Sequence, residues 1–171
     1  MIETERVYVG LGSNLSEPIK QLGEALCALQ KLPNTRLVAV SSFYASDPLG
    51  PPEQPRYVNA VAALATTMPP LGLLDALQDI ERNQGRERKA ERWGPRTLDL
   101  DILLFGDRLL NEARLKVPHY HLHARAFVLY PLAELAPASL RLPDGRRLTD
   151  LLAACPFNGL EKLDSVSVDN R

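Results

Sequence analysis

Two carboxylates separated by one residue, Asp99 and Asp101, stand in the apolar run from Leu98 to Phe105. The run predicts a strand. Because alternate side chains of a strand share a face, both carboxylates point to the same side while the apolar side chains around them pack inward. Like charges this close repel one another unless a cation lies between them, and carboxylate oxygens are ligands that Mg²⁺ prefers. The pair therefore indicates a magnesium site, and an exposed strand face with scattered acids is the alternative.

The segment just before this strand, residues 82–96, is basic. Six arginine and lysine residues against two glutamates give it a net charge of +4, and Gly85, Gly94 and Pro95 favour a mobile loop over a long helix. Guanidinium groups form paired hydrogen bonds with phosphate oxygens, and metal ions with arginines commonly serve phosphoryl transfer. The chain has no P-loop sequence. Because the basic segment 82–96 lies directly before the two carboxylates, it predicts a polyphosphate site. A charged loop exposed to solvent is the alternative.

A pair of glycines marks a second position where the backbone could approach a ligand. The segment from Gly10 to Asn14 contains both, but Leu15 stands where a dinucleotide-binding loop has its third glycine. We therefore interpret the segment as a turn. Its glycines let the backbone come close to another strand or to a flat ligand.

Three histidines alternate at His119, His121 and His123. In an extended segment this spacing would place three imidazoles on one side, as in a zinc site. The proline before them and the Arg125-Ala-Phe127 sequence after them favour a turn that enters a helix, where such spacing spreads the rings around the axis. We expect at most one or two of these histidines to face a site.

The rest of the chain predicts the elements that position these residues. Apolar runs indicate strands at 7–11, 37–44, 57–64 and 98–105. Helical spacing indicates one helix that Ser16 caps and Pro33 ends, one over about 70–83, and a short one after Thr149, which follows a hairpin-like turn at Asp144-Gly145. This order is that of a split βαβ unit. We expect an α+β fold, a ferredoxin-like sandwich of a mainly antiparallel sheet with helices packed on one face.

Length, composition and charge limit the possible partners. The 171 residues, 45 % of them hydrophobic, suit a single domain, with a core over about residues 6–157 and a loose tail over 158–171. A net charge of −1 gives no general reason to bind nucleic acid or an acidic membrane. The first residues carry acids where a secretory signal has bases, and the two cysteines lack metal-site spacing. We expect a cytoplasmic monomer.

Four segments together resemble one known family. The longest is Arg92-Trp-Gly-Pro-Arg-Thr-Leu-Asp-Leu-Asp-Ile-Leu103, which is similar to the signature of the 6-hydroxymethyl-7,8-dihydropterin pyrophosphokinases of folate biosynthesis. The other three occur in the same order along the chain as in the family. They are residues 9–15, residues 41–44 with 48–50 and 57–59, and residues 117–119 with 125–127. The matches cover most of residues 7–155.

This resemblance implies a reaction and a set of site residues. The terminal diphosphoryl group of ATP would pass to the hydroxymethyl group of the pterin with release of AMP, at two Mg²⁺ ions bound by Asp99 and Asp101. The implied catalytic residues are these two carboxylates with Arg86 and Arg96, which would hold the phosphates. The residues implied around ATP are Gln78, Glu81, Arg86, Trp93, Arg96, Ile102, Arg114, His119, Tyr120 and Arg125. Those implied around the pterin are Ser46, Asp47, Leu49, Tyr57, Asn59, Trp93, Asp99 and Phe127.

Two positions depart from the family's pattern. Asp47 stands where many relatives have an apolar residue or proline, although a contact through its backbone would survive the change. Lys116 replaces a hydroxyl residue near the nucleotide, which removes one hydrogen bond and adds a positive charge. Neither departure touches the two carboxylates.

A protein of a different class is the alternative. A non-catalytic ferredoxin-like module could use the basic loop to bind RNA or another anion, because this fold class also serves binding proteins. The net charge of −1, the acid pair beside the loop and the small number of aromatic residues count against it.

Overall fold

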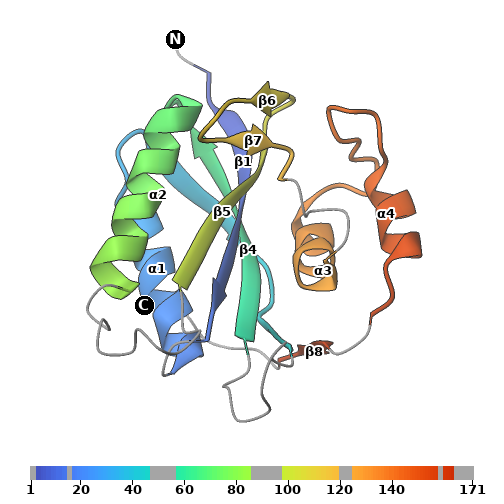
Figure 1. Cartoon of the computed structure of the whole chain (residues 1–171), viewed down its shortest axis with the longest axis horizontal. Helices are drawn as coiled ribbons and strands as arrows, with labels where there is room; N and C mark the ends of the chain where they lie inside the picture. The colour runs from blue at the N-terminus through green and yellow to red at the C-terminus, as the bar shows by residue number, and fades with distance from the viewer. Residues whose placement is uncertain are drawn as a thin grey trace.

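An antiparallel sheet forms the centre of the fold (Figure 1). The computed structural model describes residues 3–14, 17–46, 57–85, 98–119, 125–157 and 160–163. Within these residues the strand order is β5-β1-β4-β3-β8, with β2 also paired to β4, while β6 and β7 form a separate pair. The strands are β1 (Glu5–Ser13), β2 (Thr35–Val40), β3 (Tyr44–Ser46), β4 (Tyr57–Thr66), β5 (Leu98–Phe105), β6 (Leu110–Asn111), β7 (Lys116–Val117) and β8 (Leu160–Lys162). The helices are α1 (Pro18–Gln30), α2 (Pro70–Gly85), α3 (Ala126–Leu135) and α4 (Leu148–Ala154).

Helices cover both faces of the sheet, and the expectation of helices on one face was wrong. Val7 and its neighbour Tyr8 point to opposite sides of β1, yet only 0 % and 5 % of their surfaces are exposed. Val7 belongs to a core with α1 and α2, and Tyr8 to a second core with α3 and α4. Figure 1 shows the two pairs of helices on opposite sides of the sheet. The split βαβ order extends only to residue 105, so it could not place α3 and α4.

The N-terminal strand is longer than predicted. β1 continues through Gly10 and Gly12 to Ser13, so the turn expected at these glycines is wrong. The strand continues because both of its neighbours, β4 and β5, pair with it as far as Ser13. Glu17, rather than Ser16, is the N-cap residue of α1, and its side chain makes no capping hydrogen bond.

The strand predicted over residues 37–44 is divided in two. β2 ends at Val40, and β3 begins at Tyr44. Between them, the Ser41 N–H donates to the Val61 carbonyl at 2.9 Å, and the Ser41 hydroxyl accepts from the Val61 N–H at 2.9 Å. The Ser41 hydroxyl thus takes the place of a backbone acceptor in the ladder. It satisfies the Val61 N–H of β4 where the chain leaves β2.

The end of the described chain is held more firmly than expected. Residues 160–162 form β8, which pairs with β3 in a register that matches Ser46 with Leu160, so the prediction of a loose tail from residue 158 was wrong for these residues. The turn predicted at Asp144-Gly145 is confirmed: Gly145 has a φ of 98°, and Arg141 and Arg147 form a bridge on either side. The antiparallel sheet and α+β class are confirmed. No helix among the described residues is long and apolar enough to cross a membrane.

Candidate functional site

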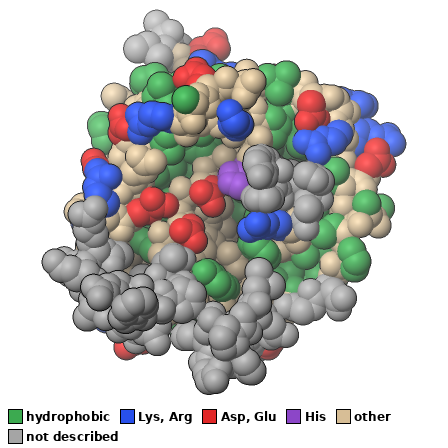
Figure 2. Space-filling model, viewed as in Figure 1, with side chains coloured by type: hydrophobic (Ala, Val, Ile, Leu, Met, Phe, Trp, Pro, Cys, Tyr) green, Lys and Arg blue, Asp and Glu red, His purple; other side chains and the backbone are tan. Residues whose placement is uncertain are grey.

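A cavity of about 690 Å³ opens on the face of the sheet that carries α3, beyond the N-terminal end of that helix. Figure 2 shows a hollow on this side, with acidic, basic and histidine side chains at its edges. The cavity exists because α3 covers only part of the face: Tyr8 lies in the core beneath the helices, whereas Gly10 and Gly12, two and four residues further along β1, line the cavity.

The floor of the cavity is built from two rungs of the sheet. In one rung, Gly12 of β1 pairs with Asn59 of β4 on one side and with Asp99 of β5 on the other. In the next, Gly10 pairs with Val61 and Asp101. The central strand therefore contributes no side chain between the functional groups of its two neighbours. Sequence reasoning missed this role of the glycines, although it identified them as a place for close backbone approach.

The two carboxylates share a face, as predicted. Asp99 and Asp101 are exposed, while Leu98, Leu100 and Ile102 are buried. The side chain of Asp101 reaches solvent, but it stands on the cavity floor where surrounding protein displaces water. This burial raises the pKa of Asp101, and electrostatic interaction with His119 and Arg125 partly opposes the effect.

A third carboxylate lies behind the pair. Glu81 of α2 accepts a hydrogen bond from the N–H of Leu100, between the two aspartates, with 2.7 Å between Oε2 and N. Burial raises the pKa of Glu81, the Leu100 N–H lowers it, and the charges of Asp99 and Asp101 raise it further. Negative charge is therefore concentrated on this side of the cavity, where a cation would be stabilised.

The donor set fits a hard divalent cation. Two carboxylates on one strand face leave most coordination positions for water and phosphate oxygens, which is the way Mg²⁺ is usually bound in phosphoryl-transfer sites. Among the described residues, no group of three or more His, Cys, Asp or Glu side chains could hold a metal by itself. The zinc interpretation gains no support there, and His121 and His123 lie outside the described residues.

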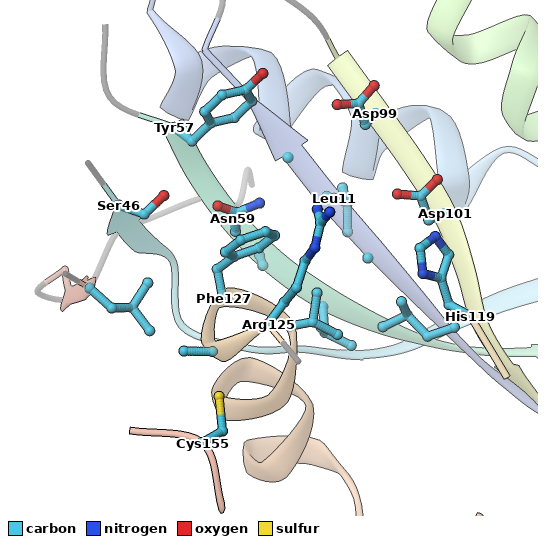
Figure 3. Close-up of a pocket in the computed structure, with 18 of the residues that line it drawn as sticks. Leu11, Ser46, Tyr57, Asn59, Asp99, Asp101, His119, Arg125, Phe127 and Cys155 are labelled. Atoms are coloured by element: carbon cyan, nitrogen blue, oxygen red, sulfur yellow. The ribbon is translucent and has the colours of Figure 1, made fainter. Parts of the chain in front are cut away.

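The opposite side of the cavity is aromatic and amide-bearing. Figure 3 shows Tyr57, Asn59 and Phe127 on the side away from Asp99 and Asp101. Tyr57 and Asn59 alternate on β4, and Phe127 projects from the first turn of α3. The guanidinium carbon of Arg125 lies 5.4 Å from the centre of the Phe127 ring. A flat ligand with polar edges suits such a wall, because rings stack on its aromatics and an amide offers both a donor and an acceptor.

Asn59 has an unused hydrogen-bonding atom in this wall. The residue is 9 % exposed, and its Oδ1 atom is buried without a hydrogen-bond partner among the described residues. An unpaired buried acceptor costs on the order of 1–3 kcal/mol. A ligand that donates a hydrogen bond in the cavity would remove this cost.

A second, more polar cavity of about 360 Å³ adjoins the first, and Asp101 and His119 line both. Arg114 stands at this second cavity, where it donates to Asp75 at 2.6 Å and to Gln78 at 3.2 Å. The Lys116 ammonium group is hydrogen-bonded to Asn111 Oδ1 at 3.0 Å and to the Glu112 carbonyl at 3.2 Å. Lys116, which departs from the family's pattern, is therefore held to the end of β6 and the loop that follows it.

The described site residues from the sequence prediction are divided between the two cavities. The larger cavity contains Ser46, Tyr57, Asn59, Asp99, Asp101, His119, Arg125 and Phe127. The second contains Gln78, Glu81, Asp101, Ile102, Arg114 and His119. Arg125, predicted beside the nucleotide, thus lies next to Phe127. The predictions for Asp47, Leu49, Arg86, Trp93, Arg96 and Tyr120 concern residues outside the described part of the chain.

Known proteins are similar to this chain in sequence. The sequence model of the family described as 7,8-dihydro-6-hydroxymethylpterin-pyrophosphokinase (HPPK) matches residues 8–137. A 2-amino-4-hydroxy-6-hydroxymethyldihydropteridine pyrophosphokinase of Pseudomonas aeruginosa is 70 % identical over 159 residues, which cover 93 % of this chain and 97 % of the relative. A protein of the same name from Haemophilus influenzae is 54 % identical over 157 residues, covering 92 % and 97 %.

The fold also matches solved structures. A crystal structure of HPPK-DHPS in complex with substrates superimposes with a TM-score of 0.70 at 11 % sequence identity, over 89 % of this chain and 45 % of that one. This chain therefore spans less than half of that longer protein, and at this identity the likeness concerns the fold alone.

Proposed function

Because this chain belongs to the 7,8-dihydro-6-hydroxymethylpterin-pyrophosphokinase family, we propose that its two adjoining cavities bind a reduced pterin and ATP. A diphosphoryl group then passes from ATP to the pterin at Asp99 and Asp101. One observation carries this assignment: Asp101 and His119 line both cavities, so Asp101 stands at the junction where two substrates would meet, with Asp99 beside it in the larger cavity.

The larger cavity takes the pterin. Tyr57 and Phe127 offer aromatic faces to its flat ring, and the buried Oδ1 of Asn59 accepts a hydrogen bond from one of its N–H groups. Ser46 lies at the same wall, and the proposal includes Asp47, Leu49 and Trp93 by resemblance. The ring thus has its hydroxymethyl group directed towards the carboxylates across the glycine floor.

The second cavity takes ATP. Gln78, Arg114 and His119 supply polar contacts there. By resemblance, Arg86 and Arg96 hold the phosphates, and Trp93 and Tyr120 are further residues around the nucleotide. Glu81 and Ile102 complete the wall. The phosphate chain extends towards Asp99 and Asp101, which would hold two Mg²⁺ ions. Bound there, Mg²⁺ neutralises phosphate charge and makes the pterin hydroxyl a better nucleophile.

The reaction exchanges one P–O bond for another. The oxygen of the pterin hydroxymethyl group bonds to the β-phosphorus of ATP, and the bond from that phosphorus to the oxygen bridging to the α-phosphorus breaks. AMP leaves with that oxygen, and the hydroxyl proton passes to solvent. The chain contributes chiefly by holding the two reactants in line, which converts an encounter in solution into a reaction within one complex.

The setting of this activity is part of the same proposal. The net charge of −1 supports small-molecule substrates rather than nucleic acid as partners. We place the protein in the cytoplasm, acting as a monomer. Size-exclusion chromatography with light scattering tests the monomer, and fractionation of cells tests the location.

The test is product formation from ATP, Mg²⁺ and 6-hydroxymethyl-7,8-dihydropterin, with AMP and ADP separated by chromatography. We expect AMP and the pterin diphosphate in equal amounts, and neither in EDTA. ADP in place of AMP would indicate transfer of one phosphate. No product from folded protein, together with binding of RNA that weakens as salt rises, would instead support the anion-binding module.

A further inference from the structure

Gly12 lies in contact with the side chain that faces the proposed pterin. It pairs with Asn59 in the sheet, and a Cβ atom placed on Gly12 would lie 2.6 Å from Nδ2 of Asn59. Real Cβ atoms essentially never approach another heavy atom this closely. The amide group of Asn59 therefore occupies the space that any other residue at position 12 would fill.

The backbone does not explain a glycine at this position. Among the described glycines, Gly106 and Gly145 have positive φ angles, and Gly12 does not. As a residue of a regular strand paired on both sides, position 12 has a conformation that any L-residue can adopt. The need for glycine comes from the neighbouring amide.

Gly10 provides a contrast on the same strand and the same face. A Cβ atom on Gly10 would lie 3.4 Å from Cδ2 of Leu103, which is ordinary van der Waals contact. The three atoms nearest to that Cβ all belong to Leu103, and none belongs to Asn59. A methyl group at position 10 would enter the cavity floor with Leu103, and not the amide of Asn59, as its nearest neighbour. The two glycines therefore separate an effect on cavity volume from an effect on Asn59.

We propose that Gly12 is a positioning residue that sets the amide of Asn59 for recognition of the pterin. This inference rests on the proposed function. The missing side chain lets Nδ2 settle against the backbone of β1, and this leaves Oδ1, the buried atom without a partner among the described residues, to accept from the ligand. A methyl group at position 12 displaces the end of a rotatable side chain rather than the backbone, so the sheet survives while the amide turns away.

The test is a double-mutant cycle on pterin binding. Affinity is measured by calorimetry with Mg²⁺ and a non-hydrolysable ATP analogue, for the wild type, Gly12→Ala, Asn59→Ala and the double variant. We expect Gly12→Ala to weaken pterin binding about tenfold or more, the loss that goes with one well-aligned hydrogen bond. In the Asn59→Ala background the same change should have less than a twofold effect, because the atom that it displaces is gone.

Two readouts and one control variant separate positioning from a general structural defect. The affinity for the ATP analogue should be equal in Gly12→Ala and the wild type. The NMR signals of the Asn59 side-chain amide should shift in Gly12→Ala without ligand, and Gly10→Ala should act on pterin affinity to the same extent with and without Asn59. If Gly12→Ala alone does not fold, folding of the Gly12→Ala/Asn59→Ala variant supports the contact, and failure of both overturns it.

The outcomes distinguish this inference from the proposed function. Wild-type protein that binds no pterin overturns both. Wild-type protein that binds pterin, with equal affinity in Gly12→Ala or with the same loss in both backgrounds, overturns the inference and leaves the proposed function in place.

Discussion

Glu81 accepts a hydrogen bond from the peptide N–H of Leu100, which lies between Asp99 and Asp101, at an Oε2–N distance of 2.7 Å. Among the described residues β5 is an edge strand of the sheet and pairs with β1 on its inner side, so its outward-facing N–H groups are not paired by another strand of that sheet. Glu81 thus fixes the edge of the strand at the point that carries both carboxylates, and it does so from a different layer of the fold, helix α2.

This relationship predicts a difference between two substitutions at position 81. Glu81→Ala removes the acceptor and should lower turnover by about 100-fold, the cost of a displacement of about 1 Å in a catalytic group. Glu81→Gln keeps an acceptor oxygen and should retain turnover within about fivefold, if the hydrogen bond and not the charge is what matters. AMP release at saturating substrates measures both. Equal loss in the two variants would assign the role to the charge.

Asp101 should be needed for turnover and not for folding. Its side chain reaches solvent at the cavity floor, where the surrounding protein displaces water and raises its pKa. Asp101→Asn therefore removes a poorly solvated charge, and the melting temperature should stay unchanged or rise. Turnover should fall by at least about 100-fold, because charge stabilisation at the phosphates is lost. Circular dichroism and AMP release measure the two effects. The matched control is Asp107→Asn, an exposed aspartate just beyond β5 that lines neither cavity.

Glu134 on α3 connects three parts of the fold. It accepts hydrogen bonds from the Ser42 N–H at 2.7 Å and from the Tyr44 hydroxyl, and Lys162 of β8 lies 3.8 Å away. Partial burial alone would raise the pKa of Glu134, but the hydrogen bonds and Lys162 outweigh it and lower the pKa below its ordinary value. Burial, and then the same carboxylate, raise the pKa of Tyr44.

The lowered pKa of Glu134 gives stability a defined dependence on pH. Because the carboxylate binds protons less readily in the folded state, its contribution is present above the ordinary glutamate pKa of 4.5 and is lost as the pH falls through the lowered value. Urea unfolding should show Glu134→Gln less stable than the wild type by about 1 kcal/mol at pH 7, with partial solvent screening included. The difference should shrink at pH 3. Glu24→Gln, an exposed residue of α1, is the control, and a constant difference would refute this assignment.

Local patterns in the sequence predicted what depends on one strand or helix. β5 was predicted at its observed bounds, and the alternation of Asp99 and Asp101 with buried leucines was enough to place both carboxylates on one face. α2 was found for the same reason, because its apolar stripe has helical spacing. These features are encoded by neighbours within a few residues of each other.

Features that depend on partners distant in sequence were missed. The break after Val40 depends on the Ser41 hydroxyl bonding to Val61 across the sheet, and β8 depends on β3 presenting an edge more than a hundred residues away. Gly12 reads as a turn residue when only its neighbours in sequence are considered. Its role as floor of the cavity follows from lying between Asn59 and Asp99, which are related by strand register and not by sequence spacing.

Phe127 should contribute to pterin affinity through its ring. It projects from the start of α3 into the larger cavity, with Arg125 5.4 Å from the ring centre. Phe127→Leu keeps an apolar side chain but removes the face on which a pterin stacks, worth about 0.5–1.5 kcal/mol, so the Kd for the pterin should rise about two- to tenfold. The Kd for an ATP analogue, measured by the same calorimetry, should stay within twofold, because Phe127 does not line the second cavity.

Phe157→Leu is the matched control. Phe157 is 50 % exposed, packs against Tyr130 at a centroid distance of 5.0 Å and does not line the larger cavity. Its loss should therefore leave both affinities unchanged. A Phe127→Leu protein that binds pterin as tightly as the wild type would assign stacking to Tyr57 alone.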